Sequence, residues 1–260
     1  MRESTPGHWD RYWKAHAVVE ETYDNGDRMI RELLREPPAG KRALEVGAGS
    51  GRDSIELARA GARVFVVDYV RSSLEVCRRL SREAGVELLC IQADATRMPV
   101  REGSFDLVFH QGVLEHFRRP AELLDENYRI LRPGGVALVD VPQTYHVYTL
   151  LKKLLIAVNR WFAGWETQYS AGSLTRVAER SGFRVEAAFG DWMVPGLFYR
   201  GLRYVLRQLR IARLPLYPGR GGRWDRWMSG LRERLRGRRW ALNTMMCVGV
   251  RARKPAVPSP

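Results

Sequence analysis

The segment Ala43–Gly51, which reads ALEVGAGSG, constrains the fold of this chain more than any other stretch. A short apolar run is followed by glycines at 47, 49 and 51, and a helical pattern begins directly after them. Glycine is needed where a backbone turns tightly or passes close to a ligand, because a Cβ would block the approach. The segment therefore predicts a strand, a ligand-contacting turn and a helix, in that order.

Two acidic residues narrow the class of ligand. Glu45 lies inside the predicted strand, and Asp68 ends the next apolar run, AGARVFVVDYV. A dinucleotide loop of the form GxGxxG would have its third glycine where this chain has Arg52. We therefore expect a nucleoside-containing ligand other than a dinucleotide. For the loop taken alone, an ordinary tight turn stays open as the alternative.

Strand and helix patterns alternate from Lys41 to Pro142. Fully apolar strands that alternate with helices are typical of a parallel sheet covered on both faces. Such sheets bind ligands at the carboxyl ends of their strands, and the glycine loop follows the first strand. We expect strands at 43–47, 62–67, 86–91, 105–109 and 135–141, separated by helices at 53–60, 71–83 and 120–131.

The 260 residues suffice for one domain with insertions around this core. We expect a single domain over 1–253 and a disordered, proline-rich tail over 254–260. The expected parts are N-terminal helices (1–40), a cofactor-binding core (41–142), an apolar helical insertion (143–172), a helix at 173–181, a strand at 183–189, a basic helical insertion (191–240) and a last strand at 244–250.

Cysteine usage and hydropathy point to the cytoplasm. Cys77, Cys90 and Cys247 are far apart, which favours neither a disulfide framework nor a metal site. The first residues lack the apolar stretch of a signal peptide, and no run of about 20 uncharged apolar residues would span a membrane. We expect a cytoplasmic protein without a metal.

Four landmarks occur in order: the loop with Glu45, then Asp68, then Asp94 in IQADATRMP, then FDLVFHQGVLEHF followed by LRPGGVALVDVP. Together they resemble the class I S-adenosylmethionine-dependent methyltransferases (methyltransferase type 11), in particular the branch that contains ubiquinone and menaquinone biosynthesis methyltransferases. The resemblance covers about residues 40–142 and extends weakly to 173–190. It implies an α/β, Rossmann-like fold with a seven-stranded, mostly parallel sheet, helices on both faces, helical insertions and an antiparallel strand seven. It also implies S-adenosylmethionine as the cofactor.

The resemblance assigns roles to individual residues. The glycines would meet the methionine part of the cofactor, and Glu45 would support its amino group. Asp68 would accept both ribose hydroxyls, and Asp94 would accept from the adenine amino group. The alternatives are a helix-start acid for Asp68 and an N-cap for Asp94. The expected cofactor-binding residues are Glu45, Gly47, Ala48, Gly49, Gly51, Asp68, Tyr69, Asp94, Ala95, His110 and Gln111.

Methyl transfer requires an oriented nucleophile and, for a weakly acidic acceptor, a base. The candidate bases are His110 and His116, although packing is the alternative role for each. Tyr145, His146 and Tyr169 would line the acceptor side, because insertions after strand five build that wall in the family.

The aromatic residues Trp9, Tyr12 and Trp13 recur at helical spacing near the N-terminus. They predict either a stripe packed in the core or a flap that closes over the cofactor.

Charge is concentrated at the C-terminal end. Residues 1–189 hold 27 Lys and Arg against 26 Asp and Glu, whereas residues 190–260 hold 16 against 3, a net charge of +13. At 100° per residue, one side of 197–213 gathers basic residues and the other gathers apolar ones. The basic row predicts contact with an anionic membrane surface. A packed helical cap is the alternative, and nucleic acid is less favoured. The row consists of Arg200, Arg203, Arg207 and Arg210.

We therefore expect a methyltransferase that acts on a small-molecule or lipid-like acceptor. It would be cytoplasmic or peripheral to the inner face of the membrane. The alternatives are a methyltransferase acting on RNA or protein and a non-catalytic scaffold that binds the cofactor or a membrane. The acceptor, the methylated atom and the oligomeric state do not follow from the sequence.

Overall fold

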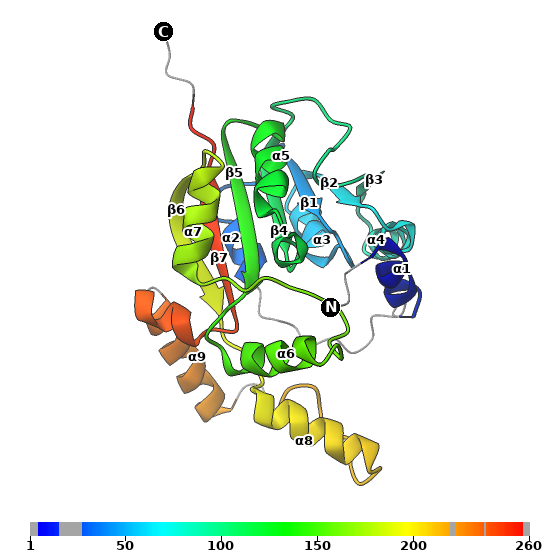
Figure 1. Cartoon of the computed structure of the whole chain (residues 1–260), viewed down its shortest axis with the longest axis vertical. Coiled ribbons are helices and arrows are strands. Elements are labelled where there is room, and N and C mark those ends of the chain that lie inside the picture. Colours follow the sequence, from blue (N-terminus) through cyan, green and yellow to red (C-terminus); the bar gives the residue numbers. More distant parts are fainter. Residues whose placement is uncertain (1–4, 16–27, 219–221, 237, 257–260) are drawn as a thin grey trace.

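A computed structural model describes residues 5–15, 28–218, 222–236 and 238–256 (Figure 1). Its centre is a seven-stranded sheet in the order β3-β2-β1-β4-β5-β7-β6. Strand β7 runs antiparallel to both of its neighbours, and the other pairs are parallel. The strands are β1 (Arg42–Val46), β2 (Arg63–Asp68), β3 (Leu89–Gln92), β4 (Phe105–Gln111), β5 (Leu131–Pro142), β6 (Arg184–Asp191) and β7 (Cys247–Arg253).

Helices cover both faces of the sheet. One apolar core joins α5 and α7 to one face, through Leu124 and Leu174 for example. A second core joins α2, α3 and α4 to the other face, through Met29, Leu57 and Leu74. The helices are α1 (Pro6–Ala15), α2 (Arg28–Leu33), α3 (Arg52–Arg59), α4 (Arg71–Glu83), α5 (Pro120–Ile130), α6 (Val147–Ala157), α7 (Ala171–Arg180), α8 (Leu197–Gln208) and α9 (Arg223–Arg236), with 3₁₀ turns η1 (Leu114–His116) and η2 (Arg239–Thr244).

The predicted fold class is confirmed, including the antiparallel seventh strand. Several strand boundaries differ from those predicted, most at the starts of three strands, and the fifth begins at Leu131 where residue 135 was expected. The third strand begins at Leu89 because residues 86–88 do not pair with β2. The last strand begins at Cys247 because η2 continues to Thr244, where Leu242 and Met245 bury themselves in a separate apolar cluster. Apolar periodicity alone does not distinguish such a turn from a strand.

Lys254, predicted as the first residue of the tail, is part of the folded body. It is buried, and its ammonium donates to the carbonyls of Tyr128 and Leu131 at 2.9 Å each. Residues 257–260 of that tail lie outside the described residues, as do residues 16–27 of the expected N-terminal helices.

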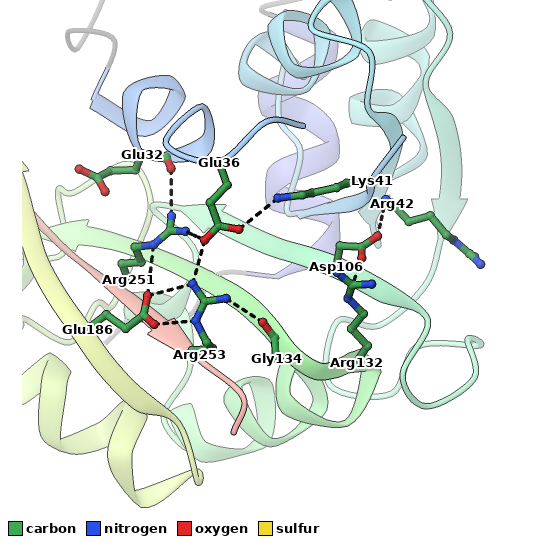
Figure 2. A network of polar contacts seen from close by, with 10 residues as sticks. All are labelled: Glu32, Glu36, Lys41, Arg42, Asp106, Arg132, Gly134, Glu186, Arg251 and Arg253. Atoms are coloured by element: carbon green, nitrogen blue, oxygen red, sulfur yellow. Dashed lines mark hydrogen bonds and ion pairs between the residues drawn. The ribbon is translucent and has the colours of Figure 1, made fainter. Parts of the chain in front are cut away.

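A network of charges fastens the amino-terminal ends of the parallel strands (Figure 2). Arg253 at the end of β7 donates to Glu186 on β6 and to Glu36 after α2. Arg251 joins the same two carboxylates. These guanidinium partners hold the pKa of Glu36 down, to about 2. The network lies at the end of the sheet opposite the glycine loop, so it fixes the scaffold and leaves the other end for ligands.

None of the helices among the described residues combines the length and the apolar character needed to cross a bilayer.

Candidate functional site

The order of the strands brings four of the predicted cofactor-binding residues to the same end of the sheet. Asp94 follows β3, Asp68 ends β2, Gly47 follows β1 and Gln111 ends β4. These four strands are neighbours in the sheet, and they are all parallel. Their carboxyl ends therefore line one side of the molecule, where open α/β sheets bind ligands.

The glycine loop adopts the left-handed conformation that glycine permits. Gly47, Gly49 and Gly51 have φ values of 65°, 54° and 66°. A Cβ on Gly47 would come within 2.6 Å of a methyl group of Val113, and one on Gly49 within 3.0 Å of the Trp13 ring. The loop is thus packed between Val113, which precedes η1, and α1, and larger residues do not fit it.

Glu45 lies behind this loop. Its side chain is buried, and it accepts a hydrogen bond from the Ser54 hydroxyl at 2.6 Å. Burial, helped by the negative charge of Asp53, raises the pKa of Glu45 to about 8. A buried carboxyl with such a pKa is poised to ionise when a cation approaches it.

Asp68 is anchored by its own loop. One carboxylate oxygen accepts from the Val70 amide and the other from the Ser73 hydroxyl, both at 2.8 Å. Burial raises the pKa of Asp68 despite these bonds. Because a carboxylate has about four lone-pair positions, the held side chain can accept further donors.

Asp94 is exposed after β3. One of its oxygens accepts from both the amide and the hydroxyl of Thr96 at 2.8 Å. These two bonds are those of the N-cap role, which is the alternative to adenine binding for Asp94. The two roles are compatible because only one carboxylate oxygen takes part in these bonds. Ala95 is half-buried beside it, and Tyr69 is 41 % exposed after β2.

Gln111 belongs to a buried polar network that the sequence did not indicate. Its amide nitrogen donates to Asp53 and its amide oxygen accepts from Arg28, both at 3.2 Å. Arg28 also makes two hydrogen bonds to Asp140 on β5, at 2.8 and 2.9 Å. The first residue of α2 is thereby tied to the ends of β4 and β5, next to the glycine loop.

His110 is wholly enclosed. It is 0 % exposed, and neither ring nitrogen has a hydrogen-bond partner among the described residues. Burial lowers the pKa of His110 to about 3, so the ring is neutral at physiological pH. These observations favour the packing role for His110 over the catalytic one.

Glu115, in the 3₁₀ turn η1, is a buried carboxyl near the predicted acceptor side. Its Oε2 has no hydrogen-bond partner among the described residues. Burial, and next the charge of Glu166, raise the pKa of Glu115 to about 8. Glu166 itself is ion-paired with Lys152 of α6. The segment after β4 therefore meets the apolar insertion through charged groups.

Helix α1 spans from the glycine loop to this insertion. The Trp9 ring packs edge-on against His116 at a centroid distance of 5.4 Å, and Tyr12 stacks on Phe162 at 5.7 Å. No residue of α1 is buried. The aromatic stripe thus covers the site from outside, as a flap would, and is not part of the core. Burial lowers the pKa of His116 under this cover.

The three residues predicted for the acceptor side come from two neighbouring segments, because the Thr144 amide donates to the Tyr169 carbonyl at 2.9 Å, but their side chains differ in exposure. Tyr145 is 61 % exposed, and His146 caps α6 by accepting from the Tyr148 amide at 3.2 Å. Tyr169 is buried, and the charge of Glu115 adds to the effect of burial in raising its pKa to about 12. Tyr169 is therefore the one of the three that lies near Glu115.

Some of these residues carried a sequence signal and others did not. Asp140 interrupts the apolar run VALVDVP, and Lys152 interrupts an apolar helix. A charge inside such a run indicates a buried partner. Arg28 carried no comparable signal. Among the described residues, no group of three His, Cys, Asp or Glu side chains is arranged to hold a metal.

Comparison with known proteins agrees with this geometry. Residues 44–139 match the family model described as a methyltransferase domain. The chain is 42 % identical over 100 residues to the demethylmenaquinone methyltransferase of Clavibacter sepedonicus, covering 38 % of this chain and 40 % of that protein. It is 41 % identical over 127 residues to the ubiquinone biosynthesis O-methyltransferase of Ralstonia nicotianae, covering 48 % and 53 % respectively.

The fold has solved counterparts. A SAM-dependent methyltransferase from Thermotoga maritima superposes with a TM-score of 0.62 at 16 % identity, covering 96 % of this chain and all of that one. The chain matches only about half the length of these two curated relatives. The matched domain, the four landmarks and the sheet order identify the chain as a member of the class I S-adenosylmethionine-dependent methyltransferase family.

Proposed function

We propose that this protein transfers a methyl group from S-adenosylmethionine to a small, quinone-like or lipid-like acceptor. The observation that carries the proposal is the convergence of the glycine loop, Glu45, Asp68 and Asp94 at the carboxyl ends of adjacent strands. The names of the two curated relatives support a quinone-like acceptor.

The residues present fit the cofactor. The loop at 47–51 has three glycines with positive φ at the carboxyl end of β1, and Glu45 offers a buried carboxyl to an amino group. Asp68 and Asp94 offer acceptor oxygens to the ribose and to the adenine amino group. The bound cofactor supplies a methyl group on a sulfonium, which is an excellent leaving group. This chain's residues bind and orient it, and α1 limits the access of water.

The acceptor side is bounded by η1, α6 and the segment that ends at Tyr169. Glu115 and Tyr169 offer an acid and a hydroxyl there. His116 stays a candidate base, while Glu115 is a further group whose pKa of about 8 suits proton exchange near neutral pH.

The experiment that tests this function is transfer of labelled methyl from S-adenosylmethionine into fractionated cell material. Label in the lipid-extractable or small-molecule fraction is the expected result. Label in RNA or in protein would favour the alternative methyltransferase. Cofactor binding by calorimetry without transfer to any fraction would favour the non-catalytic scaffold.

We further propose that the protein works at an anionic membrane surface, peripheral to the inner face, rather than on nucleic acid. The net charge of +13 over residues 190–260 supports an anionic partner. The predicted basic row is partly engaged: Arg200 donates to the carbonyl of Pro195 at 2.8 Å and Arg203 to that of Leu214 at 3.0 Å. The packed-cap alternative is not supported for α8, because none of its residues is buried.

A further inference from the structure

Helix α6 has its apolar and charged sides reversed relative to a helix that packs on a soluble core. The Lys152 side chain is 1 % exposed and is ion-paired with Glu166, which also accepts from the Trp161 indole at 2.6 Å. An ordinary surface helix buries its apolar stripe and exposes its charges. Five large apolar side chains of α6 and its C-cap, by contrast, are 50–62 % exposed, whereas Leu155 and Ile156 are half-buried. The five are Val147, Leu150, Leu151, Leu154 and Val158.

These five positions follow the i, i+3, i+4, i+7, i+11 spacing of one helix face. They therefore form a continuous apolar ridge on the outside of the molecule. Soluble proteins rarely leave such a contiguous patch without a partner. The ion pair of Lys152 with Glu166 holds the ridge outward, because rotating the helix inward would expose the pair and bury the leucines against it.

Helix α8 repeats the arrangement. Its apolar side shows Phe198 at 85 % and Val205 at 48 % exposed, with Leu209 at its C-cap at 63 %. The opposite side carries Arg200 and Arg203, which donate to backbone carbonyls of the flanking connectors. Here too the polar side is the one that contacts protein, and the apolar side is left outside.

The two helices adjoin at their first turns. Tyr148 of α6 and Leu197 of α8 pack against the same small cluster of Met193, Met246 and Cys247. Figure 1 shows both helices beyond the carboxyl end of β5, apart from the body of the sheet. The apolar faces of α6 and α8 therefore belong to the end of the molecule that holds the candidate site.

We propose that the outward apolar faces of α6 and α8 insert into the headgroup region of an anionic bilayer and deliver the site to a membrane-borne acceptor. This inference rests on the proposed function, and it assigns the insertion to these apolar faces, with the arginines as flanking charges. Arginine is the only charged residue type from 197 to 213, and each one near the surface adds to the attraction to anionic lipid.

Charge favours a bilayer over a second copy of this chain as the occupant. Two copies that met through this face would bring together two α8 segments whose charged residues, from 197 to 213, are five arginines each. An anionic bilayer accepts the apolar side chains and neutralises those charges at once. Lys153 and Arg160, exposed beside the α6 ridge, add to the same attraction.

The test is sedimentation of the full chain with phosphatidylcholine vesicles, with and without phosphatidylglycerol. We expect binding to the anionic vesicles that weakens in high salt. Leu154→Glu on α6 and Phe198→Glu on α8 should each weaken partitioning by about tenfold or more, since each removes an inserting side chain and adds a repelled charge. Leu34→Glu is the matched control, because Leu34 is exposed and lies in the chain between Glu32 and Glu36, which belong to the network at the opposite end of the sheet (Figure 2).

Several outcomes would overturn the inference. One is that the wild type does not bind anionic vesicles, or binds neutral vesicles equally well. Another is that both the α6 and the α8 variant bind anionic vesicles as strongly as the wild type. A third is that Leu34→Glu loses as much vesicle binding as these variants do. A lipid-free dimer that Leu154→Glu dissociates would assign the face to a second copy instead. Calorimetry of S-adenosylmethionine with each variant shows whether the core is intact. Vesicle binding without methyl transfer would defeat the proposed function alone.

Discussion

The indole ring of Trp13 lies directly over Gly49, so that a Cβ on Gly49 would be 3.0 Å from the ring. The contact joins the flap helix α1 to the middle of the glycine loop. A second link is the Ser72 hydroxyl, which donates to the Asp10 carbonyl at 3.4 Å. The flap therefore contacts the surface that the cofactor would touch, so the flap and the bound cofactor must adjust to each other.

We predict that S-adenosylmethionine changes the fluorescence of Trp13. Binding at the loop would alter the polarity around the indole, which is half-buried in the structure. Trp13→Phe should lose that part of the emission change and bind the cofactor several-fold more weakly. Trp240→Phe, at an exposed position in η2, should keep the change. An unaltered response in Trp13→Phe would place the flap outside the binding event.

Replacement of Gly49 separates backbone strain from crowding. Gly49→Ala should lower stability by about 1–2 kcal/mol, because φ is 54°, and should also displace Trp13 and weaken cofactor binding. Gly85→Ala carries a similar φ of 70° with no neighbour within 4 Å of the new Cβ. Thermal melts of the two should show similar strain, whereas calorimetry should show lost affinity for Gly49→Ala only.

Glu45 should couple cofactor binding to pH. Its pKa of about 8 lies above the ordinary value of 4.5, so the folded protein holds a proton that the unfolded chain has released between those pH values. Stability from this group is therefore present below pH 4.5 and falls as pH rises towards 8. An approaching ammonium group favours the ionised form, so affinity for S-adenosylmethionine should rise with pH up to about 8.

The check for Glu45 is calorimetry over that pH range with Glu45→Gln as the comparison. The variant should bind more weakly, with a pH dependence that is flatter than that of the wild type. Its stability should also fall less between pH 4.5 and 8. A wild-type affinity that does not vary with pH would separate Glu45 from the amino group of the cofactor.

His110 should affect stability at acidic pH more than it affects chemistry. Burial lowers the pKa of His110 to about 3, against an ordinary value of 6.5. The unfolded chain therefore binds one more proton between these values, and stability is lost as pH falls below 6.5. The melting temperature of His110→Leu, compared with that of the wild type, should be higher at pH 5 than at pH 8. Loss of methyl transfer with normal cofactor binding would instead restore the catalytic interpretation.

Removing one partner of the Arg28–Asp140 ion pair should destabilise the protein strongly, whereas replacing both partners together should be tolerated. Removing one partner leaves a buried charge without its counterpart, so Arg28→Ala should destabilise the protein by about 3–5 kcal/mol. The double variant Arg28→Met with Asp140→Leu should recover most of that loss, because it buries no charge. Urea denaturation measures both. Additive losses in the double variant would mean that the two residues act separately.

The sequence predicted those parts of the molecule that depend on local pattern. The alternation of strands and helices in the core, the glycine loop and the positions of Asp68 and Asp94 follow from short-range spacing and from the family resemblance. The pairing of Arg28 with Asp140 joins residues 112 positions apart, and no local pattern encodes it. Helix α6 was predicted, but not the direction it faces, because an apolar helix with two lysines is compatible with either orientation until the partner of Lys152 is known.

Strand β7 is the last strand in the chain, yet it lies between β5 and β6. Strand β6 pairs with no other strand than β7 among the described residues, so its hydrogen-bonding edge is incomplete until residue 253 has been synthesised. A nascent chain that has reached only residue 240 must therefore leave β6, and the edge of β5 that faces β7, unpaired. Folding of this half of the sheet is consequently a late event, and truncations that remove β7 should yield chains prone to edge-to-edge aggregation.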